Sequence, residues 1–96
     1  MLKNFEDFIA YCKTLKGVKL ETDARGKQFS VSVDGSRVYF IPASSGKPRR
    51  ANNVKTERVL RDLTGMKAWA PGDYRHITRH ASYILAVARH CLDNRR

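Results

Sequence analysis

The chain has 96 residues, enough for one domain with a single hydrophobic core and too few for two. Because 42% of the residues are hydrophobic and residues 1–17 contain acids but no continuous apolar run, the sequence predicts a globular, cytoplasmic protein without signal peptide or membrane span. The net charge of +10 is uneven, since residues 37–96 carry thirteen Lys and Arg against four acids and residues 1–36 carry six against five. Such a local excess of positive charge predicts a polyanionic partner.

The first half of the chain predicts a helix followed by a small sheet. Apolar residues at spacings of three and four predict a helix over residues 3–16, ended by Gly17. The apolar period then changes to two, which predicts strands over residues 18–23, 28–33 and 37–41. Asp34-Gly35 predicts a tight turn between the second and third strands, so the three strands should form an antiparallel meander.

A basic loop and a short helix are predicted next. Residues 44–50 combine glycine and proline with no apolar residue, which is typical of a loop. Asn52 and Asn53 are favourable helix N-caps, and Val54 begins an apolar pattern that predicts a helix over residues 54–64.

The longest amphipathic pattern predicts a last helix over residues 74–92, with Asp73 as its N-cap. Ile84 and Leu85 lie in the middle of its apolar stripe, and Leu92 lies at the end of the stripe. The predicted order is therefore α-β-β-β-α-α, a single small α+β domain whose three-stranded sheet packs one face against helices. Cys12 and Cys91 fall on apolar helical faces, which favours two reduced, buried thiols over the alternative of a disulfide between the terminal helices.

The third predicted strand has apolar side chains on both faces. Val38 and Phe40 face one side, and Tyr39 and Ile41 face the other. Tyr39 is therefore expected to pack beneath the last helix or beside Trp69. The alternative is an exposed Tyr39 that stacks on a nucleic-acid base.

Two groups of residues are candidate phosphate contacts. The loop and the following helix provide the first group, because backbone amides, a helix N-terminus and cationic side chains together favour an anion. Its members are Lys47, Arg49, Arg50, Lys55, Arg58 and Arg61. The polar side of the last helix provides the second group, in which Arg can fork onto phosphate or guanine and His can donate a hydrogen bond. Its members are Arg75, His76, Arg79 and His80. Tyr83 adjoins this group and is either a further contact or a residue at the rim of the core, with its hydroxyl in water.

Three catalytic or metal-binding patterns carry less weight. The loop lacks the spacing of a P-loop, so nucleotide hydrolysis is not predicted. His76 and His80 are one helical turn apart, but no acid adjoins them, so no metal is predicted. Arg75 and His80 have the R-x4-H spacing that resembles the motif of HEPN ribonucleases, but those proteins are helical bundles, whereas this sequence predicts a sheet.

The sequence thus predicts a small basic protein that binds nucleic acid, duplex DNA rather than RNA, through phosphate contacts and without a catalytic centre or cofactor. A DNA-binding protein of this kind would be associated with the nucleoid. One alternative is a small metal-independent ribonuclease of the toxin type, in which an imidazole such as that of His80 moves the proton. The other is an inhibitor or adaptor that docks on an acidic protein surface. No oligomeric state is predicted.

Overall fold

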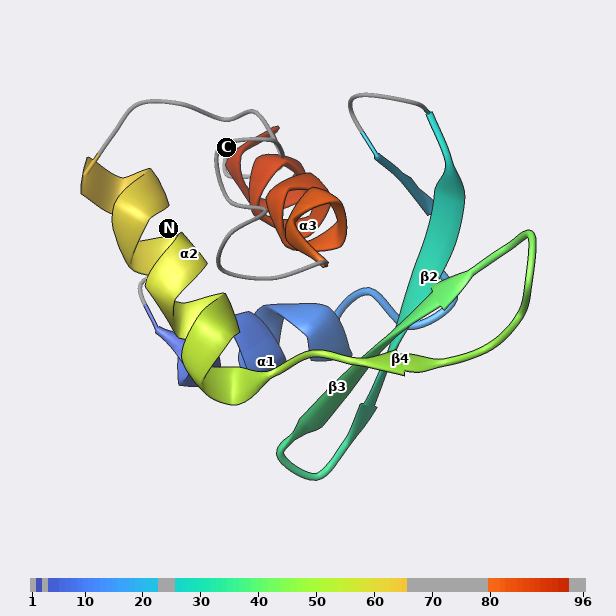
Figure 1. The fold of residues 1–96 in the computed structure, drawn as a ribbon, viewed down its shortest axis with the longest axis horizontal. Coiled ribbons are helices and arrows are strands. Elements are labelled where there is room, and N and C mark those ends of the chain that lie inside the picture. The colour runs from blue at the N-terminus through green and yellow to red at the C-terminus, as the bar shows by residue number, and fades with distance from the viewer. Residues whose placement is uncertain (1, 3, 23–25, 66–79, 94–96) are drawn as a thin grey trace.

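The computed structural model describes residues 2, 4–22, 26–65 and 80–93. Over these residues the chain forms three helices and an antiparallel sheet with the strand order β1-β2-β3-β4. The helices are α1 (Phe5–Lys13), α2 (Asn53–Gly65) and α3 (Ala81–Asp93). The strands are β1 (Leu20–Glu21), β2 (Gln28–Asp34), β3 (Arg37–Pro42) and β4 (Arg49–Arg50). In Figure 1, α3 lies between α2 and the sheet. The predicted α+β class is confirmed, with one more strand than expected.

Helix α1 is shorter than the predicted 3–16. It begins after Asn4, whose side-chain oxygen accepts a hydrogen bond from the backbone N–H of Asp7 at 2.9 Å and so caps the helix. It ends at Lys13 because the chain then turns more tightly, with the backbone N–H of Leu15 bonded to the carbonyl of Cys12. The left-handed conformation expected at the end of a helix is found at Gly17, where φ is +79°.

The turn between β2 and β3 lies one residue later than predicted. Asp34 and Arg37 are paired across the ladder, so the two central residues are Gly35 and Ser36. Only the first of these has a positive φ, +63°, as a type II′ turn requires of its first central residue. Strand β1 covers two of the five described residues of the predicted strand 18–23. It ends at Glu21 because Thr22 closes a loop, with its hydroxyl accepting from the backbone N–H of Lys27 at 3.1 Å.

The fourth strand lies inside the segment predicted to be a loop, residues 44–50. Arg49–Arg50 pairs with β3 at the edge of the sheet, and the backbone N–H of Ala51 extends this pairing with a 2.8 Å hydrogen bond to the carbonyl of Val38. Two exposed arginines show no alternation of buried and exposed residues, so the sequence pattern could not reveal this strand. A short, charged edge strand of this kind limits pairing with other chains.

Helix α2 matches its prediction to within one residue at each end. Asn52 is the N-cap, and its side-chain oxygen accepts from the backbone N–H of Lys55 at 2.9 Å. The apolar face differs from the expected one, because Val54 is 79% exposed whereas Val59 and Leu60 are buried. The isolated apolar residue at the start of α2 therefore lies on the surface rather than in the core.

Helix α3 begins at Ala81, where the carbonyl of His80 accepts hydrogen bonds from the backbone N–H groups of Tyr83 and Ile84. The predicted helix 74–92 extended further back, but residues 74–79 lie outside the described part of the chain, as does the predicted cap Asp73. At the other end, Leu92 was placed in the apolar stripe and is instead 38% exposed.

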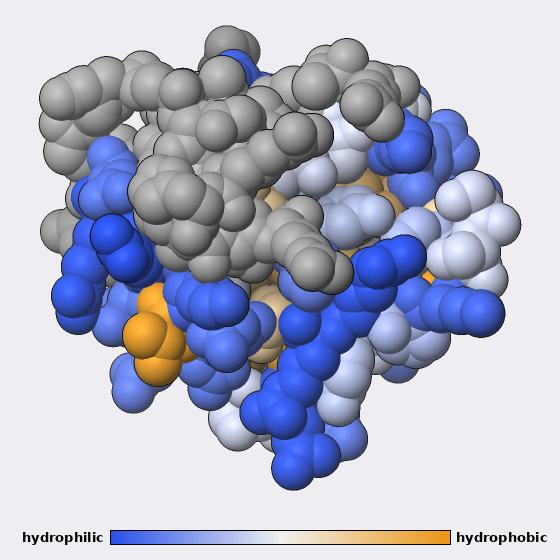
Figure 2. Space-filling model, in the orientation of Figure 1, coloured by the Kyte–Doolittle hydropathy of each residue, from blue (hydrophilic) through white to orange (hydrophobic). Residues whose placement is uncertain are grey.

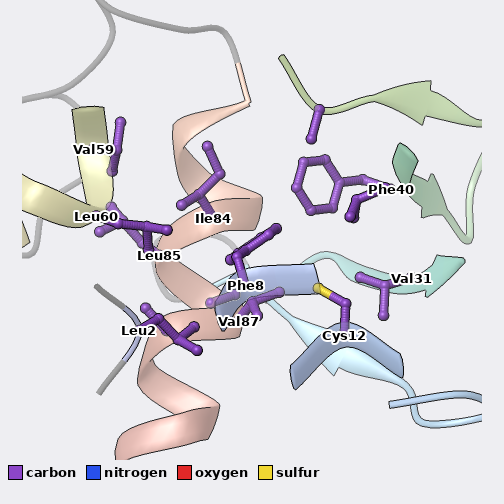
Figure 3. Packing of buried hydrophobic residues seen from close by; sticks show 14 of the residues in the cluster. Leu2, Phe8, Cys12, Val31, Phe40, Val59, Leu60, Ile84, Leu85 and Val87 are labelled. Atoms are coloured by element: carbon purple, nitrogen blue, oxygen red, sulfur yellow. The ribbon is translucent and has the colours of Figure 1, made fainter. Parts of the chain in front are cut away.

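The core joins all three helices to one face of the sheet (Figure 3). Side chains of α1, α2, α3 and the two long strands meet there, including those of Phe8, Cys12, Val31, Phe40, Val59, Leu60, Ile84, Leu85 and Val87. Residues 84–88 are all buried, so the middle of α3 is enclosed on every side rather than amphipathic. No helix in the described ranges is long and apolar enough to cross a membrane.

Both cysteines are free thiols, as predicted, although only one is fully enclosed. Cys12 is 1% exposed, whereas Cys91 is half-buried. Burial raises the pKa of the Cys12 thiol to about 12. Nearby, the Tyr11 hydroxyl and the Nδ1 atom of His90 lie 2.5 Å apart and join α1 to α3. Burial, and then the neighbouring thiols, raise the pKa of the Tyr11 phenol as well.

This buried thiol predicts a loss of stability in alkali. Unfolding lets Cys12 ionise near its ordinary pKa of 9.0, whereas the folded state keeps the thiol protonated up to about pH 12. The unfolded chain therefore binds fewer protons in this window, and Cys12 should contribute a fall in the free energy of unfolding of about 1.4 kcal/mol per pH unit. We expect urea titrations at several pH values above 9 to give a shallower pH dependence for Cys12→Ala than for wild type. Equal slopes would contradict a protonated Cys12 thiol.

Candidate nucleic-acid interface

Five exposed cations lie just before β4, on β4 and at the beginning of α2. We call this surface the basic edge, and it consists of Lys47, Arg49, Arg50, Lys55 and Arg58. No acid occurs from residue 35 to residue 56, and none of the five cations makes an ion pair with another described residue. Figure 2 shows strongly hydrophilic side chains on the part of the surface where Figure 1 places β4. The structure thus brings together most of the first predicted group.

The two arginines of β4 point to opposite faces of the sheet. Residues directly opposite each other in an antiparallel ladder share a face. Arg49 lies opposite Phe40, whose ring is buried in the core, and Arg50 lies opposite Tyr39 on the other face. The two neighbouring guanidinium groups therefore have different surroundings, although the sequence placed them together before a helix.

Arg50 is the arginine that adjoins the N-terminus of α2. It lines a hollow of about 360 Å³ together with Asn52, Asn53 and Val54. The first backbone N–H groups of a helix have no partner within the helix, and the helix dipole adds partial positive charge at this end. A guanidinium beside these donors makes the hollow suitable for an anion such as a phosphate.

Arg61 is the predicted contact whose charge is already engaged. Its guanidinium lies 2.9 Å from a carboxylate oxygen of Glu57, one helical turn earlier. The other oxygen of Glu57 accepts a hydrogen bond from the backbone N–H of Phe5 at 3.1 Å. Glu57 thus ties the start of α1 to α2, and Arg61 adds less free positive charge than the cations of the basic edge.

The second predicted group is not seen as one polar helix face. Arg75, His76 and Arg79 lie outside the described residues. His80 lies in the turn before α3 and is half-buried, with its ring 6.0 Å from that of Phe40 and 6.2 Å from that of Tyr83. It therefore packs at the margin of the core rather than on a solvated helix face.

Tyr83 and Tyr39 occupy opposite sides of the sheet. Tyr83 packs on the core face, with its ring stacked on Phe40 at 5.3 Å and edge-on to Phe29 at 4.8 Å, which matches the reading of Tyr83 as a residue at the rim of the core. Tyr39 is half-buried on the other face and does not pack beneath α3 as expected, whereas Trp69 lies outside the described residues. Side chains alternate between the two faces of the sheet along β3, so Tyr39 lies on the face opposite to that of its buried neighbour Phe40.

A second hollow was not predicted from the sequence. It has a volume of about 450 Å³ and lies at the end of the β2–β3 ladder. Its lining comes from four separate segments, namely Lys27–Gln28, the turn Pro42–Ser45, Arg49 and Tyr83. Of these residues, Arg49 was a candidate contact and Tyr83 was either a contact or a residue at the rim of the core, and no local sequence pattern joins them to the other segments. Among the described residues, no three side chains of His, Cys, Asp or Glu are arranged to hold a metal ion.

Comparison with known proteins gives no family for the chain. No protein-family model matches it, and neither the curated proteins nor the solved structures contain a significant match. The function is therefore inferred from the residues of the chain itself and from the geometry of the basic edge.

Proposed function

We propose that the protein binds nucleic acid, with duplex DNA as the preferred form, through phosphate contacts made by the basic edge. The observation that supports this proposal most is the grouping of five exposed, unpaired cations just before β4, on β4 and at the start of α2, where Glu57 is the only acid from residue 47 to residue 58. Each phosphate that a Lys or Arg neutralises releases condensed counterions, so such a surface binds a polyanion without reading its sequence.

The composition of the basic edge favours nucleic acid over an acidic protein. Protein interfaces usually have an apolar or aromatic centre surrounded by a polar rim. The basic edge has long cationic side chains, and Val54 is the exposed large apolar residue beside it. Interfaces with DNA are polar and strongly positive, which is the character of this surface.

Arg50 and Lys55 provide the direct test, because they lie on either side of the first residues of α2. We expect Arg50→Ala/Lys55→Ala to weaken binding to a 20-base-pair duplex by roughly tenfold or more at moderate salt, since two phosphate contacts are lost. The matched control is Lys13→Ala/Lys16→Ala, which removes the same charge from exposed positions at the end of α1. Fluorescence anisotropy with a labelled duplex measures both affinities, and thermal melts verify that both variants fold.

An equal loss of affinity in the two double variants would contradict the proposal, because only the net charge would then matter. Undetectable binding of wild type to duplex DNA and to RNA would contradict it more directly. In that case, binding to an acidic protein would become the better account of the charge.

A further inference from the structure

The second hollow described above, which we call the Tyr83 cavity, has a rigid aromatic wall. Tyr83 comes from α3, and its ring is held by Phe29 and Phe40 at centroid distances of 4.8 and 5.3 Å. Its hydroxyl makes no hydrogen bond with another described residue. Pro42 and Ala43 add two apolar side chains to the lining. An aromatic side chain fixed by the core in this way suits contact with a planar ring such as a nucleobase, because it does not have to be ordered when the ring binds.

The turn Pro42–Ser45 and two cations give the same cavity an affinity for an anion. Lys27 and Arg49 are exposed, line the cavity and make no ion pair within the described ranges. The backbone N–H groups of Ser44 and Ser45 donate to no described acceptor. The Ser45 hydroxyl oxygen accepts from the backbone N–H of Lys47 at 3.3 Å, which leaves its own proton available.

We propose that the Tyr83 cavity binds a nucleoside monophosphate, with the phosphate at Arg49, Lys27 and the serine turn and the base toward Tyr83. The volume of about 450 Å³ is within the range of small-molecule sites. Arg49 belongs both to the cavity and to the basic edge, so a strand bound along the basic edge can place its terminal nucleotide in the cavity. Binding of a terminal nucleotide in the cavity rests on the proposed function, whereas binding of a free nucleotide does not.

Nucleotide binding in the Tyr83 cavity is tested by titrating ¹⁵N-labelled protein with adenosine 5′-monophosphate and following the amide resonances by NMR. We expect saturable shifts of the Ser44 and Ser45 amide resonances, with adenosine or inorganic phosphate alone binding roughly tenfold more weakly. Arg49→Ala should weaken nucleotide binding by about tenfold or more, because a charge-assisted hydrogen bond is lost. Arg50→Ala is the matched control, since it removes the same charge from the adjacent residue on the other face of the sheet and should have little effect.

Two oligonucleotides identify the source of the nucleotide. One carries a phosphate at both ends and the other has the same sequence without terminal phosphates. If the phosphorylated strand binds more tightly, and if Arg49→Ala abolishes this difference between the two strands, the result would support the terminal nucleotide as the occupant. Equal binding of the two strands together with saturable binding of the monophosphate would support a free nucleotide instead.

No saturable shift of Ser44 and Ser45 with up to about 10 mM monophosphate, together with no preference for the phosphorylated strand, would overturn the cavity proposal. Equal effects of Arg49→Ala and Arg50→Ala on nucleotide binding would also overturn it. Neither result affects duplex binding by the basic edge. Conversely, nucleotide binding without duplex binding would refute the proposed function and would leave the proposal of nucleotide binding in the Tyr83 cavity standing.

Discussion

Replacing Ile84 by alanine is expected to lower the free energy of unfolding by about 2–4 kcal/mol, a large share of the stability of a small domain. Ile84 is completely buried in the middle of α3, the helix that lies between α2 and the sheet (Figure 3). The loss has two parts: the apolar side chain no longer leaves water on folding, and the surrounding side chains cannot fully close the space that remains.

The matched control for Ile84→Ala is Leu92→Ala. Leu92 belongs to the same helix and was placed in the same apolar stripe, but it is 38% exposed. We expect this variant to lose less than about 1 kcal/mol, because less surface is uncovered and no enclosed cavity forms. Urea denaturation followed by circular dichroism measures both values. A loss below 1 kcal/mol for Ile84→Ala, or equal losses in the two variants, would refute the central position of α3 in the core.

The sequence predicted those parts of the fold that depend on local signals. Asn52 and the apolar pattern after it placed α2 to within one residue at each end, because an N-cap acts within a single turn of helix. The alternation in β2 and β3 likewise placed both strands closely, since it reflects one buried face. Val54 and Leu92 were misplaced because an apolar residue at the end of a helix fits the same period whether or not another element covers it.

The arrangement of the site depends on long-range pairing, which one sequence does not contain. The basic character of residues 47–58 was evident, but the separation of Arg49 from Arg50 follows from the register of β4 against β3. The same register brings Arg49 to the cavity that Tyr83 lines from α3. No periodicity or motif connects these residues, so the cavity could be found only in the folded structure.

The affinity of wild type for duplex DNA is expected to fall roughly 250-fold to 4,000-fold between about 50 and 200 mM salt. If about five to seven phosphates are neutralised, the logarithm of the association constant should fall against the logarithm of salt concentration with a slope of about −4 to −6. The five cations of the basic edge account for the lower end of this range. Binding dominated by apolar contacts would instead change little over the same range, because salt screens charges without removing the hydrophobic contribution.

A salt titration of wild type beside Arg50→Ala/Lys55→Ala tests the basic edge most directly, because the slope reports the number of phosphates contacted rather than affinity alone. Each of the two residues should contribute about one unit of slope, so the double variant is expected to give a slope about two units shallower than wild type. The control Lys13→Ala/Lys16→Ala should keep the wild-type slope. A flat titration of wild type, or the same slope in all three proteins, would contradict phosphate binding by the basic edge.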